Sequence, residues 1–258
     1  MPAYLLDRRE IKDEARALLR AAKVSPLRFT ALFLVIDRVL SEISTAVDYI
    51  LEDALDLTAP TIQLPASSLP LSFISILVAL LSTVLIAGYS CYCLGVNRGR
   101  EMPYESLFDA FPFAGRVILL ELLQALAILA GLMLFIVPGF VLLFAYAFSL
   151  YHLCEEPERG VFDALRRSRL ELRGYKWQFF LLALSFLPLL LLVTLPVTVC
   201  EYFLRGAFPP SLGGALAHDL VTGVLTACAS VYVTPYLALA QVGFYRRVTE
   251  AASGPSEN

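Results

Sequence analysis

Ionisable residues inside apolar stretches are the first candidates for chemistry in this sequence, because each must find a partner or face a water-filled cavity. Glu42 lies four positions after Arg38, a spacing that lets the two side chains pair along one face of a helix. Asp37 and Glu121 then need partners elsewhere, and Arg116 is one candidate. The candidate polar cluster therefore consists of Asp37, Arg38, Glu42, Arg116 and Glu121.

This polar cluster has two interpretations. In the first, its acids line a cavity for a substrate or a proton, as expected of a permease or an exporter-like protein. In the second, the charges pair between helices and fix how those helices pack. The two interpretations differ in whether the acids are paired and dry or line an open cavity.

A second group of candidate residues lies in EEPERGVFDALRRSRLELRGYK, the densest basic stretch of the chain. Basic side chains beside a membrane segment attract anionic lipid head groups with about 1 kcal/mol each. The same residues could simply anchor the topology, and Asp163 and Glu171 partly neutralise them. The candidate anionic-lipid contacts are Arg166, Arg167, Arg169, Arg173 and Lys176.

Enzymatic motifs do not stand out. The sequence has no P-loop, zinc-helix motif, nucleophile elbow or dinucleotide fingerprint. Its five cysteines lie mostly in apolar runs, and we expect small buried hydrophobes there rather than a disulfide framework or a metal site. We therefore predict no catalytic residue, no cofactor, no metal and no nucleic-acid partner.

The elements that must position these residues are membrane helices. Hydrophobic residues make up 58% of the 258 residues and charged residues only 17%, which is outside the range of soluble proteins. We predict an all-α, polytopic membrane protein with a single membrane domain. An amphipathic helix over 1–27 and a basic amphipathic segment over 155–176 accompany its membrane helices, and 246–258 forms a tail. The six predicted transmembrane helices are 28–51, 71–94, 117–136, 140–154, 177–203 and 220–245.

Lys and Arg residues set the expected topology, because they are retained on the cytoplasmic side. Residues 1–27, the basic segment 155–176 and Arg246-Arg247 are therefore placed inside, with both termini cytoplasmic. An even number of crossings must then lie within the long apolar run that contains MLFIVPGFVLLF. We predict two crossings there, with Pro138-Gly139 in an outer turn. A re-entrant or kinked helix is the alternative.

Three charged amphipathic segments each precede a pair of predicted helices, which suggests three helical-hairpin repeats. These segments are DRREIKDEARALLRAAK, YESLFDAFPFAGR and PERGVFDALRRSRLELRGYK. In the first, one helical face carries Ile11, Ala15, Leu18, Leu19 and Ala22. We expect such helices to lie in the cytoplasmic interface with the apolar face down.

The string IVPGFVLLFAYAFSLYHLCEEPERGVFDALRRSRLELRGYKWQFFLLALSF, followed later by TPYLALAQVGFYRRV, resembles the bacterial membrane family called domain of unknown function 975. The opening REIKDEARALL is also similar to the N-terminal helix of that family. The positions that carry the resemblance include Pro138, Gly139, Ser168, Gly174, Pro235 and Tyr236. More distantly, the chain resembles the membrane domain that precedes some glycerophosphodiester phosphodiesterases. The resemblance implies the architecture and no known activity.

Three functions remain open from the sequence. The first is a non-enzymatic scaffold or partner subunit of a bacterial cytoplasmic membrane, with anionic lipids and an unidentified protein as partners. The second is a permease or exporter-like protein with a polar intramembrane cavity. The third is an intramembrane enzyme that acts on lipids.

Overall fold

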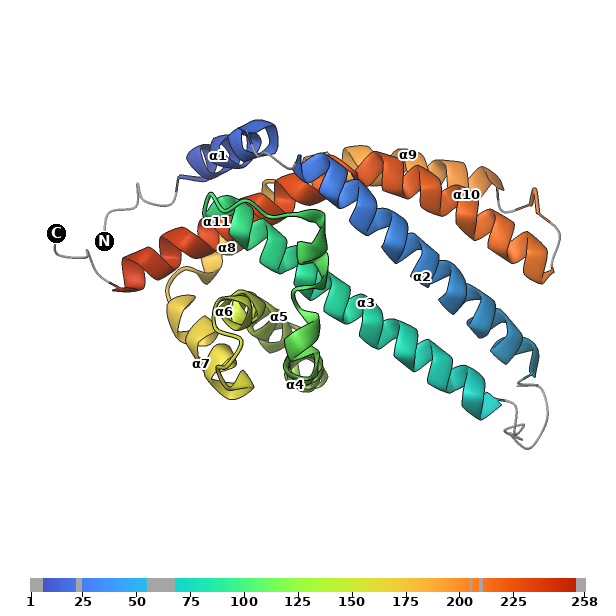
Figure 1. The fold of residues 1–258 in the computed structure, drawn as a ribbon, viewed down its shortest axis with the longest axis horizontal. Helices are drawn as coiled ribbons and strands as arrows, with labels where there is room; N and C mark the ends of the chain where they lie inside the picture. The colour runs from blue at the N-terminus through green and yellow to red at the C-terminus, as the bar shows by residue number, and fades with distance from the viewer. Residues whose placement is uncertain (1–6, 22–24, 55–67, 205, 209–210, 254–258) are drawn as a thin grey trace. The chain divides into compact units, whose positions relative to one another are not determined.

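The computed structural model describes residues 7–21, 25–54, 68–204, 206–208 and 211–253, and all of the regular secondary structure in them is helical (Figure 1). It divides into two compact units. Unit 1 consists of Met1–Thr30, Thr83–Pro188 and Tyr232–Asn258, and unit 2 consists of Ala31–Ser82 and Leu189–Val231. Two long helices, α2 and α3, contribute residues to both units.

The described residues form a series of α-helices, named in chain order. They are α1 (Arg8–Ala21), α2 (Pro26–Ala54), α3 (Ser68–Asn97), α4 (Ala114–Leu134), α5 (Ile136–Ala145), α6 (Ser149–Glu155), α7 (Val161–Glu171), α8 (Lys176–Leu184), α9 (Leu187–Leu204), α10 (Leu212–Ser230) and α11 (Val233–Ser253). Two 3-10 turns, η2 (Tyr104–Phe108) and η3 (Phe111–Phe113), connect α3 to α4.

Five helical stretches in the described residues are long and apolar enough to cross a membrane, which indicates a membrane protein. They are Pro70–Asn97, Tyr104–Leu134, Ile136–Glu155, Leu187–Leu204 and Leu212–Ser230. Each overlaps one of the six predicted membrane helices. The remaining predicted membrane helix, 28–51, lies within α2. This helix carries seven charged residues, so it is too polar to be counted with the five apolar stretches.

Several prolines lie at the starts of helices, including three in the predicted membrane segments and the predicted turn. Pro138, Pro188 and Pro235 lie within the first three residues of α5, α9 and α11. Backbone N–H groups in the first turn have no intrahelical acceptor, so proline costs no hydrogen bond there. The predicted helix 177–203 is accordingly divided between α8 and α9, and 220–245 between α10 and α11.

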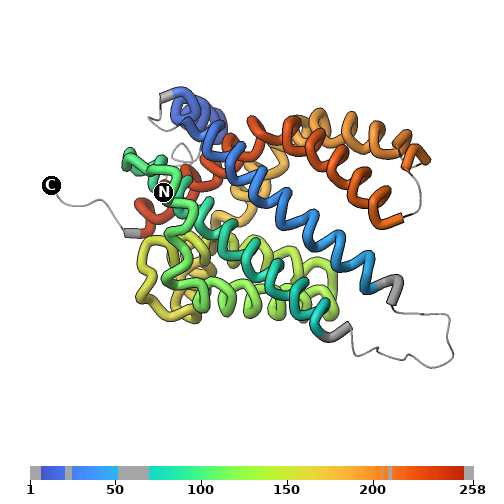
Figure 2. The backbone as a smooth tube through the Cα atoms, turned by 45° about the vertical axis from the view of Figure 1, so that its right-hand side comes forward, coloured from blue at the N-terminus to red at the C-terminus, as the bar shows by residue number. Residues whose placement is uncertain are grey.

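The reversal inside the long apolar run lies at Phe135, three residues before the predicted turn at Pro138-Gly139. Phe135 has an extended backbone between α4 and α5, and these two helices pack side by side as a hairpin (Figure 2). A Cβ atom placed on Gly131 would lie 3.0 Å from the Cα of Gly139. Gly139 is therefore a site of close helix approach and does not form the turn.

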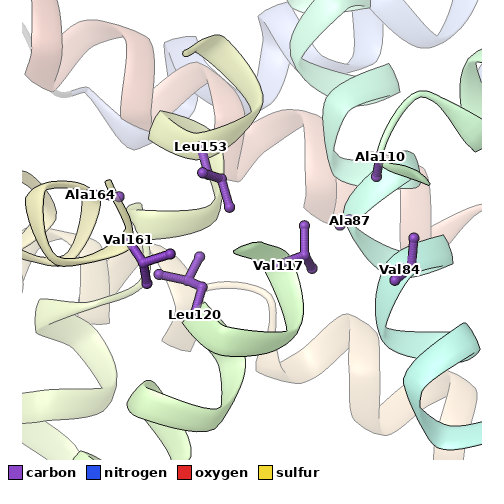
Figure 3. Packing of buried hydrophobic residues seen from close by; sticks show 8 residues of the cluster. All are labelled: Val84, Ala87, Ala110, Val117, Leu120, Leu153, Val161 and Ala164. Atoms are coloured by element: carbon purple, nitrogen blue, oxygen red, sulfur yellow. The ribbon is translucent and has the colours of Figure 1, made fainter. Parts of the chain in front are cut away.

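The core of unit 1 joins α3, α4, α6 and α7 through small and branched side chains that are buried (Figure 3). Its members are Val84, Ala87, Ala110, Val117, Leu120, Leu153, Val161 and Ala164. This packing fixes α7 against the start of the α4–α5 hairpin.

The sequence predicts that the apolar face of α1 lies against the membrane, but in the structure this face is covered by protein. Ile11, Ala15 and Leu19 are buried, and α1 packs against α11. Arg247 of α11 binds Glu10 (Nη1–Oε2, 3.0 Å) and also Glu14 (Nη2–Oε1, 2.9 Å). Ala22, predicted on the same face, lies outside the described residues.

The three amphipathic segments differ in structure. The first and third contain the α-helices α1 and α7, whereas YESLFDAFPFAGR contains the turns η2 and η3 and only the start of α4. The three-hairpin repeat therefore stays a prediction.

Candidate functional site

The predicted lipid-contact residues lie on and just after α7, which is amphipathic. Val161, Ala164, Ser168 and Leu172 are buried and fall on one helical face. Asp163 in the first turn favours the helix because it complements the positive end of the helix dipole. The opposite face carries the exposed side chains of Arg166, Arg167, Arg169 and Arg173.

Ser168 fixes the position of α7. Its hydroxyl donates a hydrogen bond to the carbonyl oxygen of Ala145 (2.8 Å) and accepts one from the backbone N–H of Phe148 (3.1 Å). These two backbone groups lie on either side of the break between α5 and α6, where helix hydrogen bonds are missing. Ser168 therefore satisfies both at once and ties α7 to the hairpin.

Lys176 follows α7 after a tight turn. Gly174 has a φ of 97°, a conformation that favours glycine, and lets the chain reverse into α8. Partial burial lowers the pKa of Lys176, and the neighbouring charge of Arg169 lowers this pKa further.

Nearby acids neutralise the five predicted lipid-contact residues less than the sequence indicates. Glu171 binds His152 (Oε2–Nε2, 2.9 Å). Among the residues that the structure describes, none of the five predicted lipid contacts has an ion-pair partner within 4.0 Å. We call Arg166, Arg167, Arg169, Arg173 and Lys176 the basic surface. It carries positive charge that can bind an anion.

Apolar surface adjoins the basic surface. Phe162, Leu170 and Trp177 are 71%, 55% and 67% exposed. A groove with an apolar surface runs between α5 and α8, and Lys176 is the one charged residue in its lining. The lining consists of Ile136, Val137, Phe140, Val141, Phe144, Lys176, Trp177 and Phe180. Cationic side chains beside exposed aromatic rings are typical of surfaces at a membrane–water boundary.

The predicted polar cluster is divided between the two units. In unit 2, Arg38 binds Glu42 (Nε–Oε1, 3.4 Å) and Asp219 of α10 (Nη2–Oδ2, 2.6 Å). The hydroxyl of Thr45 also donates to Asp219 (3.0 Å). Sequence reasoning missed Asp219 because it lies 181 positions after Arg38.

Arg116 and Glu121 belong to unit 1 and do not pair with each other. Arg116 donates a hydrogen bond to the carbonyl oxygen of Pro157 and binds Glu158 (Nη2–Oε2, 3.3 Å). Asp37 and Glu121 are partly buried. In the described ranges neither acid has an ion-pair partner.

A buried polar network in unit 1 was also missed by sequence reasoning. Tyr245 and His152 form a hydrogen bond (Oη–Nδ1, 3.2 Å), while the other ring nitrogen of His152 contacts Glu171. His152 and Tyr245 are buried. These residues join α6, α7 and α11, so the network fixes packing. No sequence signal identified it, since 93 positions separate His152 from Tyr245.

Two cysteines depart from the predicted role of small buried hydrophobes. Cys91 and Cys154 form a disulfide that links α3 to α6. The disulfide borders a pocket that also contains Arg98, Arg100, Asp109 and Glu155, and Arg98 forms an ion pair with Glu155. The pocket carries charges of both signs, so its charge does not favour an anion or a cation.

A family model described as "Protein of unknown function (DUF975)" matches residues 121–252, just over half of the chain. The chain belongs to the DUF975 family. No curated protein and no solved structure matches it. The matched part of this DUF975 protein runs from α4 to α11 and includes the whole basic surface. The opening REIKDEARALL lies outside the match.

All six positions that carried the resemblance lie in the DUF975 match, and four of them shape the hairpin and α7. Pro138 and Gly139 lie in the first turn of α5, and Gly139 allows the close contact with α4. Ser168 and Gly174 place α7 and α8. Pro235 lies in the first turn of α11, and the buried Tyr236 packs edge-on against Phe186 (5.1 Å between ring centroids). The resemblance to the membrane domain of glycerophosphodiester phosphodiesterases stays a prediction.

Proposed function

We propose that this DUF975 protein is a non-enzymatic, lipid-associated protein of a bacterial cytoplasmic membrane. It binds anionic lipid head groups through the basic surface and acts as a scaffold or a partner subunit. The supporting observation is the set of exposed arginines on α7, which have no ion-pair partners in the described residues and adjoin exposed apolar side chains.

The chemistry of the basic surface suits a phosphate group. Arginine presents a planar fork of N–H donors that matches two oxygens of one phosphate. Each basic residue near an anionic membrane contributes about 1 kcal/mol to binding. By the retention of basic residues on the cytoplasmic side, the proposed lipids are those of the cytoplasmic leaflet.

Retention of lipid by the purified protein tests this proposal. Arg166, Arg167, Arg169 and Arg173 are replaced together by Gln, and the protein is placed in nanodiscs of mixed phosphatidylglycerol and phosphatidylcholine. Native mass spectrometry then measures which lipid remains bound. Since four basic residues are removed, we expect the preference for phosphatidylglycerol to fall by about tenfold or more.

A matched control uses the four arginines of the described part of α1, which are also exposed: Arg8, Arg9, Arg16 and Arg20. Replacing these four by Gln changes the net charge by the same amount and should leave most of the lipid preference intact. An equal loss in both variants would mean that overall charge, and not the basic surface, selects the lipid.

The permease alternative rests on Asp37 and Glu121, two partly buried acids without ion-pair partners in the described chain. The pairing of Arg38 with Asp219 and Glu42 instead supports a packing role for the unit 2 charges. Proton flux into vesicles that contain the protein and a pH-sensitive dye distinguishes a permease from a packing role of these charges. A proton flux that Glu121→Gln or Asp37→Asn abolishes would favour the permease.

A further inference from the structure

The end of the α4–α5 hairpin is apolar on every side. Met133, Leu134, Phe135, Ile136 and Val137 are consecutive and between 69% and 81% exposed. None of these side chains can donate a hydrogen bond, and only the thioether of Met133 can accept one, weakly. A turn that emerged into water would leave this whole surface hydrated, at a cost of about 25 cal/mol for each Å² of apolar area.

Two hydrogen bonds pair part of the backbone at this turn. The N–H of Phe135 donates to the carbonyl oxygen of Gly131 (3.0 Å), and the N–H of Gly139 donates to the carbonyl oxygen of Phe135 (3.4 Å). Pro138 has no N–H to satisfy. Non-helical backbone in hydrocarbon is unfavourable mainly through unpaired polar groups, and these two hydrogen bonds and Pro138 reduce their number.

The free part of the hairpin is short. In α4, Val117 and Leu120 are buried in the core, whereas Leu122, Leu126 and Leu129 are more than half exposed. In the other arm, α5 ends at Ala145, where Ser168 ties it to α7. The ten residues of α5 rise about 15 Å, which is half of a hydrocarbon core of about 30 Å.

The groove between α5 and α8 places the turn close to the basic surface. Ile136 and Val137 line this groove together with Lys176 and Trp177. A hairpin that crossed the bilayer would place its turn about 30 Å from residues at the head groups of the starting side. Ile136 and Lys176 line the same groove, so they cannot be separated by the thickness of the hydrocarbon core.

We propose that the α4–α5 hairpin enters only one leaflet of the membrane and ends within its hydrocarbon. The leaflet is the one whose head groups face the basic surface, and lipid chains of that leaflet cover Met133–Val137 and fill the α5–α8 groove. The choice of leaflet rests on the proposed function, whereas the depth of the turn does not.

Depth-dependent fluorescence quenching tests this proposal. Cys is introduced as Val137→Cys, and separately as Leu134→Cys, after Cys200 and Cys228 have been changed to Ser. A bimane label on either position is compared in bilayers whose lipids carry bromine at shallow or deep chain positions. Trp177 is the single tryptophan of the chain and reports the head-group level without a label.

We expect deep bromines to quench the label more than shallow ones, and the opposite order for Trp177. A membrane-impermeant maleimide should label neither Val137→Cys nor Leu134→Cys from either face of sealed vesicles. Gly206→Cys, at an exposed position between α9 and α10, is the positive control for labelling from one face.

Labelling of Val137→Cys from the face opposite the basic surface would overturn the proposal, because the hairpin would then cross the membrane. Labelling from the same face, or quenching that is strongest with shallow bromines, would overturn it as well, because the turn would lie outside the hydrocarbon. Loss of anionic-lipid preference is a separate measurement, so failure of the proposed function is distinguishable from failure of this depth assignment.

Discussion

Unit 1 and unit 2 bury their side chains very differently. Unit 1 contains most of the buried apolar residues of the described chain, whereas those of unit 2 are Phe33, Leu40 and Val47. In α9, a helix of 18 residues, no residue is buried. Unit 1 therefore derives its stability from its own core, and unit 2 needs lipid or another molecule to cover its helices.

The two units also differ in how they achieve specific packing. Phe148 in unit 1 is fully buried and contacts Tyr151, Phe179, Phe244 and Tyr245 at ring-centroid distances of 5.1–6.3 Å. Unit 2 instead joins α2 to α10 through the charges of Arg38 and Asp219. The packing of aromatic rings joins the helices of unit 1, whereas an ion pair joins two helices of unit 2.

The largest predicted effect is in the aromatic core of unit 1. Phe148→Ala should lower the free energy of unfolding by about 3–5 kcal/mol, since the cavity lies among four other rings. Leu192→Ala is the control in unit 2, where the side chain is 70% exposed, and should change stability by about 0.5 kcal/mol or less. Chemical unfolding in detergent micelles measures both, and equal losses would remove the distinction between the units.

A smaller effect is expected when the charge pairing of unit 2 is broken. Asp219→Asn removes the carboxylate that binds Arg38 and Thr45, and should cost about 1–3 kcal/mol. Hydrogen exchange should become faster in α2 and α10 but not in α6 and α7. Asp48→Asn, at an exposed acid of the same unit, serves as the control. Faster exchange in α7 would show that the units are not independent.

The smallest effect is predicted at the surface of unit 1. Glu10→Gln removes one of the carboxylates that bind Arg247 in the described residues, and the Glu10 side chain is 60% exposed. Pairs of this kind contribute about 0.2–1 kcal/mol, and Glu14 retains part of the interaction. Amide exchange in α1 should rise slightly while thermal unfolding stays the same. A large drop in stability would mean that the Glu10–Arg247 ion pair contributes more than an exposed surface pair does.

Features that depend on neighbouring residues could be predicted from the sequence. Apolar runs identified five helices of membrane length, and the spacing of Arg38 and Glu42 predicted their ion pair. Pro138 and Gly139 are typical turn residues and predict the chain reversal three residues after its position at Phe135. In the structure Pro138 lies in the first turn of α5, where the backbone needs no N–H donor. Gly139 allows α5 to pack closely against α4.

Features that depend on distant residues could not be predicted. Asp219 as the partner of Arg38, the disulfide of Cys91 with Cys154 and the contact of His152 with Tyr245 all join separate helices. One sequence contains no measure of which helices become neighbours. The buried face of α1 shows the same limit, since an apolar stripe fits a membrane surface and another helix equally well.

The pairing of α1 with α11 has a consequence for the order of events during synthesis. Residues 8–21 leave the ribosome long before residues 233–253, and at about 5–20 residues per second the interval is on the order of tens of seconds. Throughout this time Ile11, Ala15 and Leu19 have no covering helix. An unfinished chain would therefore display a hydrophobic stripe that the completed protein hides, a difference that chaperones or proteases could use to recognise stalled translation.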